Sequence, residues 1–327
     1  SYIVDCFLQR PDSGDCGDNL ALVALGGYGR EELFPASDID LMILYRPKLK
    51  KRIASIADAV LYPLWDTGME VGHGVRTVRE SVKHAKEDYF FLVALLDARL
   101  IHGSETLFDE LLTAYRKRFI DGGRVRFVET MKTHRQSRRE RFGSHSYLLE
   151  PHIKEGRGGM RDLQAMIWTA RVVFGLKGLD DIQGAGLLLE EERRDVREAR
   201  DMLVRLRGYM HYSSKRKNDQ LYFEHQEDAA GAFGYKPEGE VLGVEIFMRD
   251  VYRALHTVSI ITDLFFDHVD EVLGLAFNGP RGADSVIEKG IEVKSGRIHL
   301  TATRETLQAK PQILVRLFLA MSRTGLK

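Results

Sequence analysis

The chain is poor in cysteine, and this scarcity excludes two classes of protein. Cys6 and Cys16 are the only cysteines among 327 residues, and both lie near the start. A disulfide scaffold needs more of them, and a cysteine-rich zinc site needs them at metal-ligand spacing. We therefore expect a protein of a reducing compartment, the cytoplasm. A chain of this length buries a large core and is expected to divide into two domains.

The sequence also lacks long apolar runs and an excess of charge. No apolar stretch approaches the roughly 18 residues of a membrane-spanning helix, and no charged-then-apolar signal segment opens the chain. Lysine plus arginine equals aspartate plus glutamate, at 48 each. Nothing in this balance indicates a nucleic acid or a membrane as partner, and we expect neither. The chain begins with Ser1 instead of methionine, so we expect a piece of a longer protein.

The pattern of apolar residues in the first 120 positions predicts a small mixed sheet with covering helices. Short apolar runs at Leu20–Leu25, Ile39–Tyr45 and Met69–Arg76 are typical of buried strands. Apolar residues recur at helical spacing from Ile53 to Leu64. Thr77 with glutamate three residues later forms a capping box, which predicts a helix start.

Helical patterns dominate from residue 121 to residue 327, so the sequence as a whole predicts an α+β fold with a second, mostly helical domain. A loop at 148–161 interrupts the helices, and a short β-hairpin is predicted near 291–300 around Ser295-Gly296. The predicted helices span about 124–142, 161–174, 190–215, 225–233, 240–268 and 311–321.

A glycine pair and two aspartates form the most informative pattern. Gly26-Gly27 ends the first apolar run, and Asp38 and Asp40 stand at alternate positions of a second run that is counted here from Asp38 to Tyr45. Alternate residues of a strand project to one face, about 7 Å apart along the chain. Two like charges repel by about 4 kcal/mol at 4 Å and an effective dielectric constant near 20, so a fold that keeps such a pair usually supplies a cation. The pattern predicts Mg²⁺-assisted attack on a nucleotide phosphate.

The glycine pair by itself is weaker evidence. A dinucleotide-binding unit needs a helix directly after the glycines, whereas Pro35 and Ser37 interrupt any helix here and the next element is a strand. For Gly26-Gly27 alone, a tight turn without a ligand is the better interpretation. The addition of Asp38-Ile39-Asp40 ten residues later favours a phosphate site.

This combination resembles the nucleotidyltransferase superfamily related to DNA polymerase β, and within it the bacterial uridylyltransferases of the PII signal-transduction protein. The resemblance extends over roughly residues 20 to 270. It rests on these segments: Gly26-Gly27-Tyr28-Gly29-Arg30-Glu31-Glu32-Leu33, Ser37-Asp38-Ile39-Asp40-Leu41, Leu64-Trp65-Asp66, Val71-Gly72-His73, Val75-Arg76-Thr77, Glu150-Pro151, Ile153-Lys154-Glu155-Gly156, Gly158-Gly159-Met160-Arg161-Asp162, Arg216-Lys217-Asn218-Asp219-Gln220-Leu221 and Phe223-Glu224-His225-Gln226.

The resemblance implies a polymerase β-like nucleotidyltransferase domain at 1–120 and a helical domain at 121–327. It implies that backbone N–H groups of Gly26 and Gly27 cradle the triphosphate of UTP, where side chains would block close approach. Asp38 and Asp40 would hold two Mg²⁺ ions. A tyrosine hydroxyl of PII would displace pyrophosphate, in the control of nitrogen metabolism.

Further candidates each have an alternative role. Arg30 or Ser37 would bind phosphate oxygens, or Arg30 would form an ion pair with Glu31 or Glu32. Lys154 and Arg161 would supply positive charge to the nucleotide from the glycine-rich loop. Alternatively, Arg161 would pair with Glu150 or Glu155 and Asp162 would cap the following helix. Arg216 to Asp219 is expected to be a polar cluster at a helix end that faces the catalytic domain, and contact with the base or ribose is the less favoured alternative.

A third carboxylate is expected beside Asp38 and Asp40, as a metal ligand or as the acceptor of the hydroxyl proton. Glu70, in the strand predicted at Met69–Arg76, is the candidate, with Asp66 or Asp88 as alternatives. His73 is interpreted as structural, because no second histidine or cysteine stands at metal-ligand spacing.

The chain departs from the family in several places. Arg157 stands where proline is expected, Gly74 where serine is common and His152 where asparagine is frequent. No His-Asp dipeptide occurs, so the metal-dependent phosphohydrolase domain and the regulatory domains of the whole family protein are absent from these residues. Two other functions stay open: transfer to another protein or a small molecule, and a non-catalytic nucleotide-binding module.

Overall fold

The computed structural model describes residues 17–143, 147–275, 285–288, 290–294 and 297–324. The chain groups into two compact units, one ending at Phe266 and the other beginning at Asp267. The boundary predicted near residue 120 falls inside the first unit and stays a prediction. Cys6 and Cys16 lie outside the described residues.

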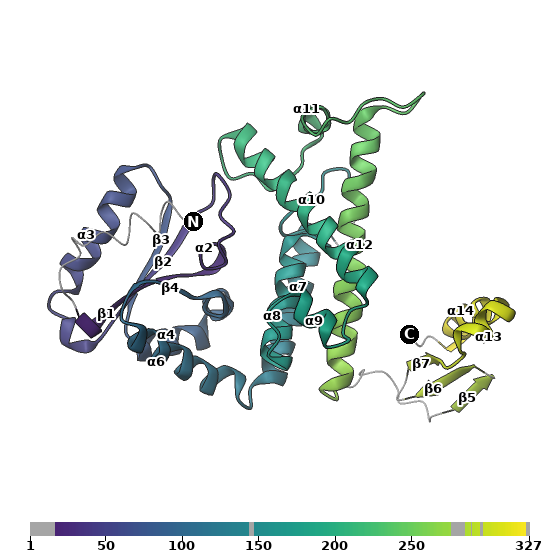
Figure 1. The fold of residues 1–327 in the computed structure, drawn as a ribbon, viewed down its shortest axis with the longest axis horizontal. Coiled ribbons are helices and arrows are strands. Elements are labelled where there is room, and N and C mark those ends of the chain that lie inside the picture. The colour runs from purple at the N-terminus through teal and green to yellow at the C-terminus, as the bar shows by residue number, and fades with distance from the viewer. Residues whose placement is uncertain (1–16, 144–146, 276–284, 289, 295–296, 325–327) are drawn as a thin grey trace. The chain divides into compact units, whose positions relative to one another are not determined.

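A four-stranded mixed sheet forms the first part of the first unit (Figure 1). The strand order is β3-β2-β1-β4, with β1 antiparallel to β2 and β4, and with β2 parallel to β3. Together with the helices that follow, this sheet confirms the α+β class. The bounds are β1 Leu20–Ala24, β2 Ile39–Tyr45, β3 Val71–Arg76 and β4 Arg99–Gly103.

Helices cover both faces of this sheet. The odd-numbered residues of β2 pack against α3 (Ile53–Asp66) in one apolar cluster. On the opposite face, the hydroxyl of Ser81 in α4 (Val78–Glu87) lies 3.6 Å from the sulfur of Met42. Because side chains alternate along a strand, Asp40 projects to the same face as Met42.

The predicted capping box at the start of α4 is confirmed. The hydroxyl of Thr77 accepts a hydrogen bond from the backbone of Glu80, whose carboxylate accepts one from the backbone of Thr77 at 2.8 Å. The sequence patterns missed several short elements around the sheet. These are α2 Gly26–Gly29, α5 Tyr89–Ala94, α6 Glu105–Tyr115, the 3₁₀ turns Gly17–Asn19, Pro47–Leu49 and Leu95–Asp97, and a π-helical turn at Arg116–Ile120.

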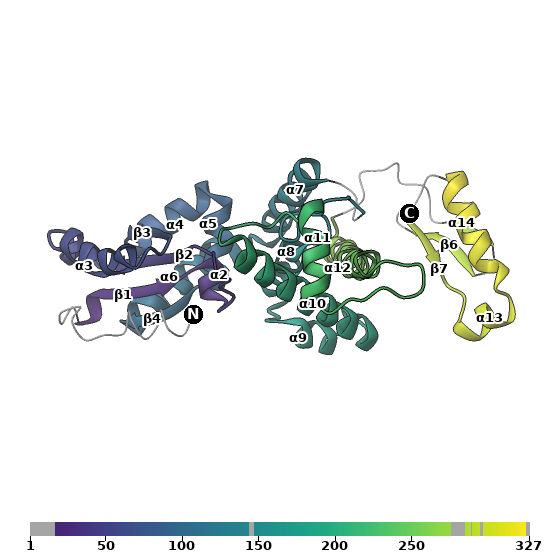
Figure 2. The ribbon, with the colours of Figure 1, turned by 90° about the horizontal axis from the view of Figure 1, so that it is seen from above.

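Long helices make up the rest of the first unit (Figures 1 and 2). The predicted helices are confirmed with ends within four residues, and α9 is an addition. The bounds are α7 Arg124–Phe142, α8 Met160–Phe174, α9 Leu179–Gly184, α10 Glu190–Ser214, α11 Phe223–Ala232 and α12 Gly243–Val272, the last of which continues past Phe266 into the second unit.

The second unit contains a three-stranded antiparallel sheet in the order β5-β6-β7. The strands β6 (Ile291–Lys294) and β7 (Arg297–Leu300) occur where the sequence predicts a hairpin, although Ser295 and Gly296 lie outside the described residues. The other elements are β5 Ser285–Glu288, α13 Arg304–Ala309 and α14 Gln312–Thr324. In the described part of the chain, no helix has the length and apolar character needed to cross a membrane.

Candidate functional site

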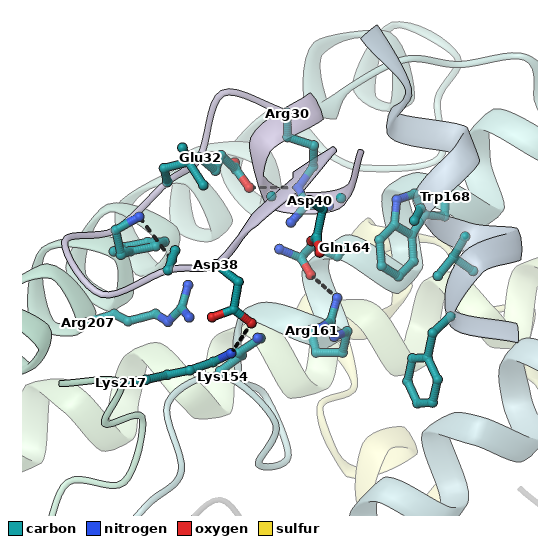
Figure 3. Close-up of a pocket in the computed structure, with 18 residues that line it drawn as sticks. Arg30, Glu32, Asp38, Asp40, Lys154, Arg161, Gln164, Trp168, Arg207 and Lys217 are labelled. Carbon is teal, nitrogen blue, oxygen red and sulfur yellow. Dashed lines mark hydrogen bonds and ion pairs between the residues drawn. The ribbon is translucent and has the colours of Figure 1, made fainter. Parts of the chain in front are cut away.

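Residues from distant segments line one cleft of about 180 Å³ in the first unit (Figure 3). All the candidate site residues except Glu70 contribute to its wall. They come from the turn after β1, from the start of β2, and from the loop and helix around residue 160. The contributing candidates are Gly26, Gly27, Arg30, Ser37, Asp38, Asp40, Lys154 and Arg161. The structure brings them together, and their individual roles stay predictions.

Two glycines hold the carboxylate of Asp40 between them. A Cβ atom at Gly26 would lie 3.0 Å from Asp40 Oδ2, and one at Gly72 would lie 2.8 Å from Asp40 Oδ1. Gly26 has a φ of +52°, which glycine adopts without strain. Gly72 pairs with Asp40 in the parallel register of β2 and β3. A side chain at either position would therefore displace this carboxylate.

Asp38 and Asp40 differ in their electrostatic surroundings. The ammonium of Lys217 donates a hydrogen bond of 2.7 Å to Asp38 Oδ2. Burial raises the pKa of Asp38, but the hydrogen bond and charge of Lys217 outweigh it and hold that pKa below its usual value. Burial, and then the negative charge of Asp38, raise the pKa of Asp40. Neighbouring cations therefore compensate the negative charge of Asp40 less completely than that of Asp38.

An oxygen of Asp38 is available for a cation. Asp38 Oδ1 is buried and has no hydrogen-bond partner among the described residues. A buried carboxylate oxygen without a partner is costly unless a ligand supplies one. Asp38 and Asp40 offer hard oxygen donors of the kind that Mg²⁺ prefers. These two residues therefore fit a divalent cation.

Several cationic side chains line the same cleft as Asp38 and Asp40 (Figure 3). Lys154, Arg161, Arg207 and Lys217 all contribute to it. Burial, followed by the charges of Arg161 and Arg207, lowers the pKa of Lys154 to about 8. An anion in the cleft would compensate these charges. A triphosphate that carries a divalent cation complements both the aspartates and these cationic side chains.

Arg30 and Ser37 have structural partners. The guanidinium of Arg30 lies 2.9 Å from Glu32 Oε2 and 2.5 Å from Asp97 Oδ2, so the predicted pairing with Glu32 is present. Asp97 also accepts a hydrogen bond of 2.8 Å from the indole of Trp168. The hydroxyl of Ser37 accepts one of 3.1 Å from the backbone of Phe34. Both residues thus stabilise the wall of the cleft.

The loop before α8 is tied to its helix through Arg161 and Asp162. Arg161 lies 3.2 Å from Glu155, the alternative pairing expected from the sequence, and donates to Gln164 at 2.8 Å. The buried carboxylate of Asp162 accepts a hydrogen bond of 2.9 Å from the backbone of Gly158. These contacts hold the loop that carries Lys154 at the cleft.

The strand assignment of Glu70 is wrong. β3 begins at Val71, because its pairing with β2 begins with Ile39 opposite Val71. Glu70 is an exposed residue before the strand, and its carbonyl accepts a hydrogen bond of 2.8 Å from Ile39. A side-chain hydrogen bond with Glu70 contributes to the lowered pKa of Asp38, after burial, which raises that pKa, and Lys217, which lowers it. The role of Glu70 as third carboxylate stays a prediction.

No group of three or more aspartate, glutamate, histidine or cysteine side chains able to hold a metal occurs within the residues that the structure describes. His73 is among these residues, and its ring contacts Trp65 edge to face at 5.5 Å. That packing agrees with a structural role for the histidine.

Arg207, Gln164 and Trp168 also line the cleft, although no sequence pattern indicates them as site residues. Arg207 lies over the ring of Phe34 at 4.1 Å and contacts Asp219 at 2.5 Å. Nothing in the sequence distinguishes it from the other arginines of α10. The segment Arg216–Asp219 did carry a signal, since it was expected to face the catalytic domain, and Lys217 does reach Asp38.

Comparisons with known proteins agree with this geometry. A family model described as GlnD PII-uridylyltransferase matches residues 126–266. A bifunctional uridylyltransferase/uridylyl-removing enzyme of Azospirillum brasilense is 35% identical over 256 residues, 78% of this chain and 27% of that protein. One from Pseudomonas putida (strain W619) is 35% identical over 277 residues, 84% of this chain and 31% of that protein.

A third relative of the same description, from Nitrobacter hamburgensis, is 31% identical over 327 aligned positions, 95% of this chain and 34% of that protein. The chain therefore spans about a third of the length of the curated relatives it matches.

Proposed function

The chain belongs to the PII-uridylyltransferase family, and from this premise we propose that it transfers UMP from UTP to a tyrosine hydroxyl of the PII signal-transduction protein and releases pyrophosphate. The observation that carries the proposal is a single cleft that contains both Asp38 and Asp40 and several cationic side chains. These cations include Lys154, Arg161, Arg207 and Lys217. The reaction would serve nitrogen regulation in the cytoplasm.

Asp38 and Asp40 would hold Mg²⁺, with the family resemblance favouring two ions. The unpartnered Oδ1 of Asp38 and the glycine-flanked carboxylate of Asp40 support this assignment. When bound, Mg²⁺ neutralises charge on the triphosphate and on the transition state at the α-phosphorus.

The protein groups would position the two substrates. Gly26 and Gly27 leave room for the triphosphate to approach the backbone, and Lys154 and Arg161 offset its charge. The tyrosine oxygen forms a bond to the α-phosphorus while the bond to the bridging oxygen of pyrophosphate breaks. The hydroxyl proton passes to a carboxylate, for which Glu70 beside Asp38 is our candidate.

The test is incubation of the chain with UTP or ATP labelled at the α-phosphate, with and without purified PII and Mg²⁺. In the presence of Mg²⁺, we expect PII to be labelled by UTP and not by ATP. The Asp38→Asn and Asp40→Asn variants should leave PII unlabelled. Label from ATP, or label on a different acceptor, would point to a related nucleotidyltransferase. UTP binding without transfer under any of these conditions would point to a non-catalytic module.

A further inference from the structure

Lys217 places a positive charge directly on the acidic pair. Its Nζ lies 2.7 Å from Asp38 Oδ2, although the two residues are 179 positions apart in the sequence (Figure 3). The side chain of Lys217 is 44% exposed, so it has room to adopt other rotamers. The contact joins the loop after α10 to the start of β2.

The backbone that carries Lys217 is held in place by Asp219. The carboxylate of Asp219 lies 2.5 Å from Nε of Arg207 and 3.0 Å from Nε2 of His211. Its carbonyl accepts a hydrogen bond of 2.8 Å from the backbone of Ile153. Because these anchors hold the loop, a change of partner for Lys217 requires only rotation of its own side chain.

The ammonium and a divalent cation compete for Asp38. Lys217 bonds to Oδ2, while Oδ1 is buried without a partner in the described part of the structure. A metal ion bound by this carboxylate would be repelled by the nearby ammonium. Phosphate oxygens would attract the same ammonium, because Lys217 lines the cleft together with Lys154 and Arg207.

We propose that Lys217 is an exchangeable counterion. It neutralises Asp38 while the cleft is free of nucleotide, and it transfers its hydrogen bond to a phosphate oxygen when the nucleotide enters. The inference rests on the proposed function, since it requires Asp38 as a metal ligand and a triphosphate in the cleft. Its consequence is that a free divalent cation binds weakly, and that cation and nucleotide bind best together.

The test measures cation binding and anion binding separately, without turnover. Free Mn²⁺ is titrated into the chain without nucleotide and followed by electron paramagnetic resonance. Inorganic triphosphate is titrated in the presence of EDTA and followed by calorimetry. For Lys217→Met we expect Mn²⁺ to bind about tenfold more tightly and triphosphate about tenfold more weakly than in the wild-type chain.

Two variants serve as controls. Lys217→Arg keeps the charge and should leave both affinities within about twofold of the wild-type values. Arg216→Met removes a charge from the same loop at a residue that does not line the cleft, and it should change neither affinity by more than about twofold. Thermal unfolding verifies that each variant is folded.

Opposite shifts in the two affinities support the counterion, because a merely structural lysine would change both in the same direction or neither. Unchanged Mn²⁺ binding, or unchanged triphosphate binding, in folded Lys217→Met overturns the inference. Asp38→Asn separates this result from the proposed function. If Asp38→Asn abolishes Mn²⁺ binding while Lys217→Met leaves it unchanged, only the counterion is wrong. If Asp38→Asn leaves Mn²⁺ binding intact, Asp38 is not a metal ligand. Both the metal site of the proposed function and the counterion inference are then wrong.

Discussion

Asp162 and Asp263 are surrounded by arginines, whereas Asp38 and Asp40 lie together in the cleft, one just before β2 and the other at its second residue. Asp162 pairs with Arg138 and lies 3.4 Å from Arg135. Asp263 lies 3.0 Å from Arg135, 2.6 Å from Arg139 and 3.1 Å from Arg157. Asp162 and Asp263 thus join α7, the loop before α8, α8 itself and α12 in one cluster of charges.

The pKa values of Asp263 and Asp40 shift in opposite directions. Burial raises the pKa of Asp263, but the hydrogen bond and charge of Arg139 and the charge of Arg135 hold it below the usual value. Burial and the neighbouring Asp38 raise the pKa of Asp40. Compensated carboxylates stabilise a fold only while their partners remain, whereas uncompensated ones oppose folding. Arginines compensate Asp162 and Asp263, and Lys217 compensates Asp38, whereas the pKa of Asp40 stays raised. This difference supports the proposed cation at Asp40.

The largest expected effect is on transfer. Asp40→Asn should reduce uridylyl transfer by about 10³-fold, because it removes an anionic metal ligand. The melting temperature should stay the same or rise, since the substitution removes the repulsion between Asp40 and Asp38. Labelled transfer and thermal unfolding measure the two effects. Asp201→Asn, on an exposed residue of α10, is the control. Transfer above a tenth of the wild-type rate in Asp40→Asn would break the distinction between the two pairs.

The next largest effect is on stability. Asp162→Asn should lower the free energy of unfolding by about 3 kcal/mol, because it removes the fully buried negative charge that Arg135 and Arg138 share. Urea denaturation measures the change. Asp180→Asn is the matched control, since Asp180 is exposed and pairs with Arg193 at 2.8 Å on the surface, where about 0.5 kcal/mol is expected. Equal losses in the two variants would contradict a structural role for the Asp162 cluster.

A third substitution tests whether transfer depends on the position of the Asp40 carboxylate. In Gly72→Ala the added methyl group would meet Asp40 Oδ1 at 2.8 Å and displace the carboxylate, so transfer should fall by about 10- to 100-fold. Gly208→Ala is the control, because the residue lies in α10 and the added methyl group meets no atom within 4 Å apart from its chain neighbours and the nearby backbone of its own helix. That change should raise stability by about 0.5–1 kcal/mol and leave transfer unaltered. Full transfer by Gly72→Ala would show that the position of Asp40 tolerates a shift.

The smallest effect concerns pH. Because the pKa of Lys154 is lowered to about 8, the ammonium is largely charged at pH 7 and largely neutral at pH 9. The affinity for inorganic triphosphate should therefore fall by about tenfold over this interval, more steeply than in Lys154→Met. Calorimetry at successive pH values measures it. The folded-state pKa lies below the unfolded value of Lys, so this group's contribution to stability rises with pH above about 8. Identical pH profiles for the wild type and Lys154→Met would refute the assignment.

The elements that the sequence predicted well are those with strong local signals. The strands that carry Leu22 and Leu41, the capping box at Thr77 and the long helices follow from periodicity and capping, which depend on neighbouring residues. β4 was missed, because its five residues Arg99–Gly103 show little alternation and become a strand by pairing with β1. Glu70 was misplaced for the related reason that strand ends depend on the partner strand.

By itself, the sequence indicated that Asp38 and Asp40 lie two positions apart at the start of a strand behind a glycine turn, because such a pattern is local. The structure places Asp40 in β2 and Asp38 just before it. The sequence also determined the family resemblance, which rests on residue identities. Only the tertiary structure decided that Gly72 supports Asp40, that Arg207 lines the cleft and that Lys217 neutralises Asp38. These contacts join residues 32 to 179 positions apart, and such contacts arise from how the strands and helices pack around one another.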